Sequence, residues 1–279
     1  MGRPHTEFIA AQRLPWEKVP GDARADCQAK ILSIDPERGD CSLLVRYPAG
    51  WRRGAEVLGC DEELFVLDGD LTIDGHPYRE HGYAFLPAGH GRRDAASRHG
   101  AVVLTFFSAW PRLASTAIKS NAPAIQGLDS IAMDWDTKDI DPGLAFMGIR
   151  RKTLRVNPEF NQRSTFLIAT APHNHPKGWK CPTLTHPCVE ECFMLGGDLT
   201  GPQGVLHTGT YFWRPPDVPH GPFGSLNGSL SLIRFVYGRH INVWGKEDVP
   251  YTFTPEHRPV LPAHLAALGR EPYRGTMPY

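Results

Sequence analysis

The chain has 279 residues with 30 basic and 30 acidic side chains, and it contains no lysine-rich block. The electrostatic footprint of a nucleic-acid-binding protein is therefore missing, and we expect a small-molecule substrate and no nucleic-acid partner. No apolar run approaches the ~20 residues that a bilayer-spanning helix needs, so we expect no membrane partner and a cytoplasmic location.

Short apolar runs between clusters of Gly, Pro, Asp and Asn dominate the sequence, and long helical periodicity is scarce. This pattern is typical of an all-β sandwich or barrel. In chain order, the expected strands are 41–47, 62–73, 83–87, 101–108, 164–170, 211–215 and 230–238.

The sequence repeats itself. "GCDEELFVLDGDLT" at 59–72 aligns with "PCVEECFMLGGDLT" at 187–200, a shift of 128 residues, and the same shift aligns Gly50-Trp51 with Gly178-Trp179. Two copies of one domain follow from this repeat. We expect an N-terminal domain over 1–115, a linker rich in Ala, Ser and Pro over 116–130, and a C-terminal domain over 131–250.

The last 29 residues, 251–279, have many prolines and few apolar positions. They cannot make a core of their own, so we expect an arm that rests on another surface. A homodimer, with the terminal arms in its interface, is the expected assembly.

The six cysteines are expected to be free thiols, because the chain is large and shows no secretion signal. Cys188 and Cys192 are separated by three residues, so the Cys-x-x-Cys spacing of redox and zinc sites is absent.

Two motifs of the second copy resemble those of the cupin superfamily. The first motif is matched by Gly178, His186, Glu190 and Gly197, with Leu184 at the place where the family usually has a histidine. The second motif is matched by Gly209, Pro215 and His220, with Asp217 at the place of a glycine. The lead-ins "PERGDCSLLVRYPAGW" and "PEFNQRSTFLI" look like the ChrR-like, anti-sigma-factor-type branch. The resemblance implies two tandem cupin domains, each a jelly-roll, double-stranded β-barrel.

His186, Glu190 and His220 are the candidate metal ligands. Residues two apart on a strand share a face, so a lumenal face would bring these three side chains together. Two imidazoles and one carboxylate with open positions favour Fe(II), and Mn, Ni and Zn are alternatives. Glu191 competes with Glu190 for the inward register, and the step to Gly197 favours Glu190.

Leu184, Cys192 and Met194 are expected to line the substrate pocket, because they share the face of the ligands. Tyr211 and Trp213 are further pocket candidates, although the strand period alone leaves open whether their face is the lumen or the exterior. His173 and His175 are candidate extra ligands that could replace what Leu184 lost, with loop positions as the alternative.

The first copy keeps the scaffold and lacks the ligand histidines. Glu56, Leu58, Glu62 and Arg92 occupy the four ligand positions. A lone carboxylate in a barrel is costly unless it is paired, so we expect Glu62 and Arg92 to form a salt bridge.

Three functions remain open at the sequence level. The resemblance implies an Fe(II)-dependent dioxygenase that acts on a small diketone, hydroxyaryl ketone or phenol. The alternatives are a metal-dependent isomerase or lyase, and a non-catalytic metal or ligand sensor. No residue beyond the metal ligands is a catalytic candidate, because no cysteine or serine has a visible activating base.

Overall fold

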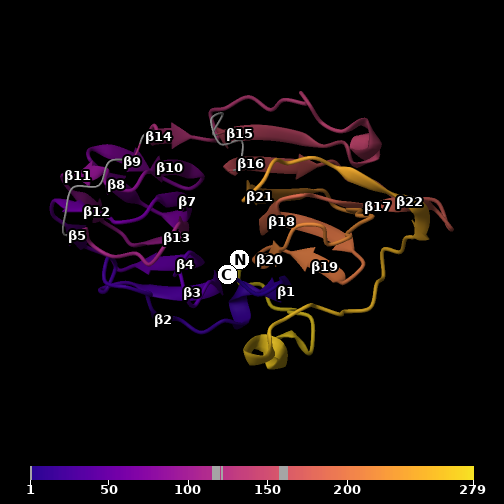
Figure 1. Ribbon diagram of the computed structural model, residues 1–279, viewed down its shortest axis with the longest axis horizontal. Helices are drawn as coiled ribbons and strands as arrows, with labels where there is room; N and C mark the ends of the chain where they lie inside the picture. The colour runs from indigo at the N-terminus through magenta and orange to yellow at the C-terminus, as the bar shows by residue number, and fades with distance from the viewer. Residues whose placement is uncertain (1, 115–119, 121, 157–162) are drawn as a thin grey trace. The chain divides into compact units, whose positions relative to one another are not determined.

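The computed structural model describes residues 2–114, 120, 122–156 and 163–279. The regular elements of the described chain are antiparallel strands and three short 3₁₀ helices, η1 (Ala11–Arg13), η2 (Pro142–Met147) and η3 (Ala263–Gly269) (Figure 1). The expected all-β class is confirmed. In the described part of the chain no helix has the length and apolar character needed to cross a bilayer.

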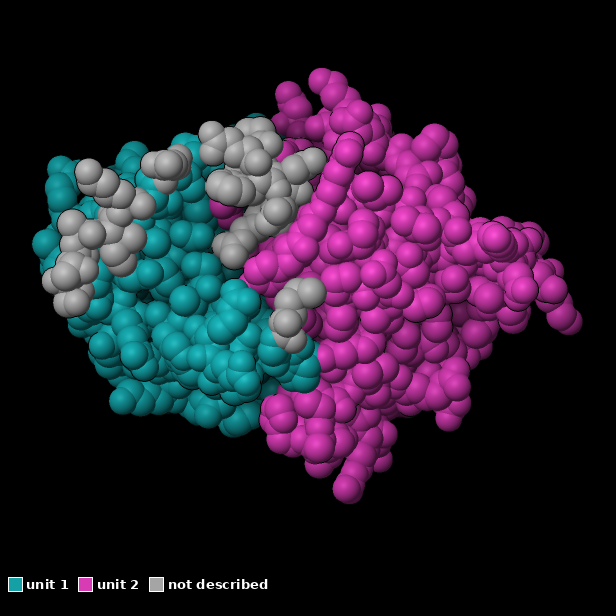
Figure 2. All heavy atoms as spheres, viewed as in Figure 1, with its two compact units in different colours: residues 1–4, 14–133 teal, residues 5–13, 134–279 magenta. Residues whose placement is uncertain are grey.

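The chain divides into two compact units (Figure 2). The first unit comprises residues 1–4 and 14–133, and the second comprises residues 5–13 and 134–279. This division differs from the expected domains at the N-terminus, because residues 5–13 belong to the second unit. The strand that they form pairs with a strand more than 190 residues away, and no local pattern reveals such a pairing.

The first unit contains one large sheet in the order β14-β10-β7-β13-β4-β3-β2 and a smaller sheet in the order β5-β12-β8-β9, and β11 pairs with β6. Its strands are β2 (Glu17–Lys18), β3 (Gln28–Ile34), β4 (Cys41–Tyr47), β5 (Trp51–Arg53), β6 (Glu56–Val57), β7 (Glu62–Gly69), β8 (Leu71–Ile73), β9 (His76–Tyr78), β10 (Gly82–Leu86), β11 (Gly91–Arg92), β12 (Ala95–Ser97), β13 (Ala101–Phe107) and β14 (Ile125–Asp129).

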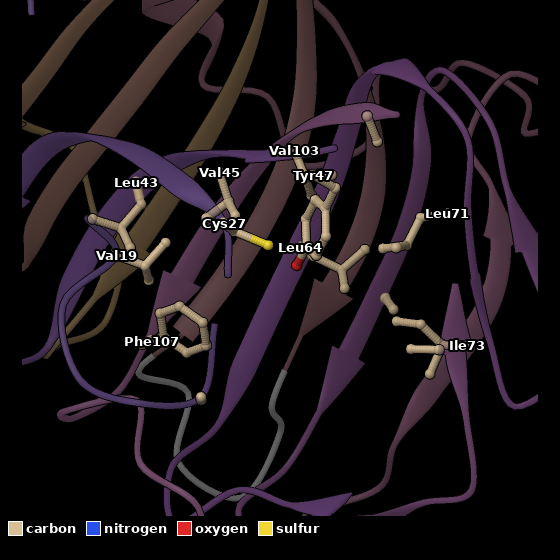
Figure 3. Close-up of a cluster of buried hydrophobic side chains, with 14 of the residues drawn as sticks. Val19, Cys27, Leu43, Val45, Tyr47, Leu64, Leu71, Ile73, Val103 and Phe107 are labelled. Atoms are coloured by element: carbon tan, nitrogen blue, oxygen red, sulfur yellow. The ribbon is translucent and has the colours of Figure 1, made fainter. Parts of the chain in front are cut away.

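The core of the first unit follows from strand alternation. Leu43, Val45 and Tyr47 are every second residue of β4, so they project from one face, and all three are buried in the hydrophobic cluster of this unit. Figure 3 shows Tyr47 beside Leu64 of β7 and Val103 of β13. The three central strands of the sheet thus build the core together.

The second unit contains a large sheet in the order β1-β20-β18-β21-β16-β15, with β19 paired to β18, and a separate pair of strands, β17 and β22. Its strands are β1 (Thr6–Ala10), β15 (Arg150–Val156), β16 (Arg163–Thr170), β17 (Lys180–Thr185), β18 (Val189–Gly201), β19 (Gly204–His207), β20 (Thr210–Arg214), β21 (Ser229–Val236) and β22 (Val243–Pro250). The long strand β18 lies between β20 and β21, and it carries the candidate ligand Glu190.

The repeat seen in the sequence is also a repeat of detailed geometry. The hydroxyl of Tyr83 donates to Glu63 at 2.6 Å in the first unit, and Tyr211 donates to Glu191 at the same distance in the second. Both residues of the second pair lie 128 positions after their counterparts. The two units therefore share one strand register around this buried tyrosine and glutamate.

Gly69 and Gly197 mark the same bend in both units. Their φ angles are 80° and 73°, and a Cβ atom at either position would lie 2.0 Å from the backbone oxygen of Gly100 or Gly228. Only glycine fits this left-handed, close-packed position. The backbone conformation thus explains why glycine stands at both aligned positions.

The structure places the expected linker and the expected C-terminal arm differently. Most of 115–121 lies outside the described residues, but Ile125–Asp129 forms β14 and pairs with β10 of the first unit, so this part of the expected linker is a strand. Residues 251–279 contain no strand beyond an isolated bridge between Val260 and Glu7. The arm therefore rests on the second unit of its own chain at this point.

Candidate metal centre

His186, Glu190 and His220 lie together in the second unit. His186 directly follows β17, Glu190 is the second residue of β18, and His220 lies in the segment between β20 and β21. Their ligand atoms all lie within 4.8 Å of one another. Paired backbone hydrogen bonds of 3.0 Å between Leu184 and His220 hold the two histidine-bearing segments side by side.

Backbone carbonyls orient both imidazoles. Nδ1 of His186 lies 3.0 Å from the oxygen of Ile241, and Nδ1 of His220 lies 2.9 Å from the oxygen of Val218. A carbonyl can only accept, so each Nδ1 carries a proton, and Nε2 is the nitrogen whose lone pair a neutral ring offers to the site. This anchoring of the ring nitrogen away from the site is the usual support of a metal-binding histidine.

The electrostatics of the site keep His220 neutral. Burial and then the charge of Arg214 lower the pKa of His220 to about 3. For Glu190, burial opposes ionisation, but the charges of Arg214 and the histidines outweigh it and lower the pKa of this carboxyl. At neutral pH the site therefore offers the neutral imidazole of His220 and the carboxylate of Glu190.

Arg214, which the sequence reasoning missed, is a buried partner of Glu190. Its guanidinium donates to Oε2 of Glu190, and its Nε donates to Oε1 of Glu7 on β1 at 2.7 Å. The side chains of Arg214 and Glu7 are 1 % and 0 % exposed, so the pairing offsets part of the cost of burying these charges. β1 thus supplies one carboxylate of the chain Glu7–Arg214–Glu190.

The donor set fits a divalent metal ion. Oε2 of Glu190 lies 3.8 Å from Nε2 of His186 and 3.5 Å from Nε2 of His220. Ligand atoms at about 2.0–2.2 Å from an ion are about 3.0–3.5 Å apart in tetrahedral or octahedral geometry. The two printed separations are therefore at or slightly above this range, and all three ligand atoms lie within 4.8 Å of one another, so a small inward movement would let them hold an ion.

The candidate ligands open onto a cavity of about 540 Å³ that is lined mainly by apolar side chains. Leu184 and Cys192 line it, as expected from their strand positions. Met194 shares the face of Cys192, but it packs in the core with Phe8 and Leu206 rather than lining the cavity. The pocket position expected for Met194 is therefore wrong.

Tyr211 and Trp213 lie on the other face of β20, and their expected pocket positions are wrong too. Trp213 is paired with Glu191 in the β18–β20 register, and the hydroxyl of Tyr211 donates to Glu191. Phe212, the residue between them, lines the cavity instead. The same alternation confirms that Glu190, rather than Glu191, faces the site.

His173 and His175 do not reach the candidate ligands. Nδ1 of His173 contacts the oxygen of Ala171 at 2.8 Å, and its Nε2 accepts from the amide of Ser225. The ring of His175 stacks on Trp179, with centroids 3.7 Å apart. Both histidines belong to an aromatic cluster outside the cavity lining, and the extra ligands expected here are wrong.

His240 is a second residue that sequence reasoning missed. It follows β21 in a loop without a motif, and its ring stacks on Phe235 with centroids 3.6 Å apart. The ring centroid of His186 lies 4.8 Å away, and His240 lines the cavity. A polar side chain thus borders the candidate metal site from the loop side.

The corresponding place in the first unit holds a closed ionic cluster. Arg92 pairs with Glu62 at 2.5 Å and with Glu56 at 3.2 Å, and Arg24 pairs with the same two carboxylates at 3.0 and 2.7 Å. The expected salt bridge between Glu62 and Arg92 is confirmed, and Arg24 enlarges it. The guanidinium groups pair with the carboxylates that a metal ion would need as ligands.

All six cysteines are free and buried. Burial raises the pKa of Cys188 to about 12, and burial likewise raises the pKa of Cys192 far above its ordinary value. Neither thiol is a thiolate at neutral pH, so neither is prepared to act as a nucleophile.

Comparisons with known proteins identify the fold. A family model described as a domain of unknown function (DUF4437) matches residues 7–109, and no curated protein matches the sequence. A Nostoc punctiforme protein described as a putative dioxygenase matches with a TM-score of 0.72 and 19% identity, over 90% of this chain and 92% of that chain.

Two further structures are similar over most of their length. A putative glyoxylate-induced protein from Pseudomonas aeruginosa matches with a TM-score of 0.59 and 13% identity, over 87% of this chain and 93% of that chain. A mutant of Bacillus subtilis oxalate decarboxylase matches with a TM-score of 0.53 and 10% identity, over 86% of this chain and 80% of that chain. Another structure of that decarboxylase is described with Mn(II) centres.

These neighbours are cupin-fold proteins, and the decarboxylase is a bicupin. Together with the repeated geometry of the two units, they confirm the expected fold of two tandem cupin domains. The three relatives do not identify the ChrR-like branch, which stays a prediction.

Proposed function

We propose that the protein is a metal-dependent cupin enzyme with one divalent ion in the second unit, and that it is a non-heme Fe(II) dioxygenase for a small oxygenated organic molecule. The observation that carries this proposal is the convergence of His186, Glu190 and His220 on one cavity, with both Nδ1 atoms held by carbonyls. Two imidazoles and a carboxylate with open positions form the ligand set of non-heme Fe(II) oxygenases.

Each part of the site has a role in this proposal. His186 and His220 would hold the ion through Nε2, and Glu190 would hold it through Oε2. Bound Fe(II) supplies the one-electron redox chemistry that a reaction with dioxygen requires. Leu184, at the place of the family's additional histidine, has no ligand atom, so that coordination position would stay open to a substrate oxygen.

The apolar lining of the cavity supports this role by excluding water. Ile168, Ile233 and Phe235 line the same cavity as the ligands, so a substrate that fills it displaces solvent from the site. The buried Cys192 contributes bulk to the same wall, and its raised pKa keeps it out of the chemistry. Similarity to a putative dioxygenase agrees with the proposal at the level of the fold.

The test is oxygen consumption by the iron-loaded protein. The chain is loaded with Fe(II) without air and then mixed with aerated buffer and a panel of diketones, hydroxyaryl ketones and phenols. We expect oxygen uptake that matches substrate loss in the wild type and in Cys192→Ser, and none in His220→Ala. His173→Ala is the matched control, because His173 is a histidine of the same unit outside the site.

Two results would contradict the dioxygenase. Loss of substrate without oxygen uptake would identify the isomerase or lyase alternative. An iron-loaded protein that turns over no member of the panel and consumes no oxygen would favour the sensor.

A further inference from the structure

The cavity of the second unit has an uneven distribution of polar side chains. Its candidate ligands are gathered in one place, while most of the remaining lining is apolar. The apolar wall is carried by Ile168, Leu199, Phe212, Phe223, Ile233 and Phe235. A molecule that fills this cavity therefore meets the candidate ligands in one place and mostly hydrocarbon elsewhere.

The hydroxyl groups of the lining are already engaged with the protein. The hydroxyls of Thr170 and Ser229 lie 2.7 Å apart and bond to one another, and Ser231 lies 3.4 Å from the oxygen of Ile168. These groups therefore add little polarity for a ligand to use.

The charged lining residues outside the metal centre are engaged too. Asp141 accepts from Asn242 and Trp244, each at 2.8 Å. Arg151 pairs with Asp139 at 3.4 Å and lies 3.7 Å from Asp136. Among the described lining residues, no arginine or lysine is left without a carboxylate partner.

This arrangement disfavours a small dicarboxylate. One carboxylate could bind the metal, but Arg151, the one arginine or lysine among the described lining residues, already pairs with Asp136 and Asp139. A second carboxylate would therefore lack a cation of its own, and a buried charge without a partner is costly. A cavity of about 540 Å³ is also within the range that holds a drug-sized molecule. Both size and polarity point away from a two-carbon diacid.

We propose that the substrate is a one-ended molecule, with metal-chelating oxygens at one end and an aryl or medium-chain alkyl body that fills the apolar wall. This inference rests on the proposed function, because it assigns the substrate class of the same site. The chelating end of the substrate faces His186, Glu190 and His220, and its apolar body lies against Ile168, Phe212 and Ile233.

Hydroxamic acids test the inference, because they present one chelating head on bodies of different size. Calorimetric titration of the Zn(II)-loaded protein compares octanohydroxamate, benzohydroxamate, acetohydroxamate and oxalate. We expect octanohydroxamate to bind at least 100-fold more tightly than acetohydroxamate, because each buried methylene adds to the affinity, and benzohydroxamate to lie between them. Oxalate should bind more weakly than octanohydroxamate.

A cavity-filling variant locates the body of the ligand. Ile168→Trp should weaken octanohydroxamate at least tenfold and leave acetohydroxamate within threefold of the wild type. Leu226→Trp is the control, because Leu226 is 49 % exposed and lies outside the lining. The metal-free protein should also bind octanohydroxamate more tightly than acetohydroxamate, although both affinities should be lower. The inference can therefore be tested whether or not the protein binds the metal.

Failure of the inference and failure of the proposed function give different results. Affinities of octanohydroxamate and acetohydroxamate within threefold of each other, or tighter binding of oxalate, would overturn the one-ended substrate. The expected body preference in a protein that consumes no oxygen would uphold the substrate class and contradict only the dioxygenase.

Discussion

Arg214 donates a hydrogen bond to Oε2 of Glu190, the same oxygen that lies 3.5 Å from Nε2 of His220 and 3.8 Å from Nε2 of His186. The guanidinium therefore shares its carboxylate oxygen with the place of the candidate metal ion. In the first unit, Arg24 and Arg92 both pair with the corresponding carboxylate, Glu62, and no histidine is present at the ligand positions. A buried arginine next to Glu190 thus stabilises the carboxylate before a metal binds.

The double variant Glu7→Gln/Arg214→Gln should bind a divalent metal at least tenfold more tightly, a gain of about 1.4 kcal/mol. Removing the buried cation lifts its repulsion of the ion and leaves the metal as the counterion of Glu190. The metal-free variant should melt at a lower temperature than the wild type, and added Zn(II) should raise its melting temperature by more. Thermal melting with and without Zn(II) measures both effects.

Arg234→Gln is the matched control, because Arg234 pairs with Glu191 on the other face of β18. It should lower the melting temperature and leave the shift caused by Zn(II) unchanged. A Zn(II) shift in the double variant that is equal to or smaller than that of the wild type would contradict the competition between Arg214 and the metal.

Glu7 should contribute an acid-dependent part of the stability. Burial opposes its ionisation, but the hydrogen bond with His5 and the charge of Arg214 outweigh burial and lower the pKa of Glu7 from 4.5 to about 2. The contribution is fully present above pH 4.5 and is lost as the pH falls toward 2. The shift corresponds to roughly 3 kcal/mol at neutral pH.

Urea unfolding of the wild type and Glu7→Gln at pH 7, 5 and 3 measures this contribution. The variant should be the less stable protein at pH 7, and the difference between the two should shrink at pH 3. A difference that stays constant across the three pH values would show that the ionisation of Glu7 does not stabilise the fold.

Arg92→Leu should destabilise the first unit by roughly 3–5 kcal/mol, because it leaves Glu56 and Glu62 with one fewer buried cation. The metal content of the protein should not change. Arg93→Leu is the neighbouring control, since the side chain of Arg93 is 81 % exposed, and it should change the free energy of unfolding by less than about 0.5 kcal/mol. Equal effects of the two variants would show that the ionic cluster does not hold this unit together.

The fold and the ligand register could be predicted from the sequence because both depend on the spacing of residues within short motifs. The repeat aligns Gly69 with Gly197, where the backbone admits only glycine, and it aligns Glu62 with Glu190 on equivalent strands. Asp217, at the place of a motif glycine, keeps the left-handed backbone of that turn with φ of 61°. The backbone of a turn restricts which residues can stand at such positions, so these residues appear in the sequence as a motif.

Other features of the site depend on contacts that local spacing does not show. Glu7 and Arg214 are 207 positions apart, and only the pairing of β1 with β20 brings them together. His240 lies in a loop whose path no periodicity predicts. For Tyr211 and Trp213, the period of two defines two faces of the strand but does not say which one is the lumen.

Elemental analysis of the purified chain and its variants tests most directly whether one metal ion is bound by His186, Glu190 and His220. We expect about one divalent ion per wild-type chain, a large loss in His220→Ala because one of three ligands is removed, and unchanged content in His173→Ala. About two ions per chain, or unchanged metal content in His220→Ala, would contradict a single metal centre in the second unit.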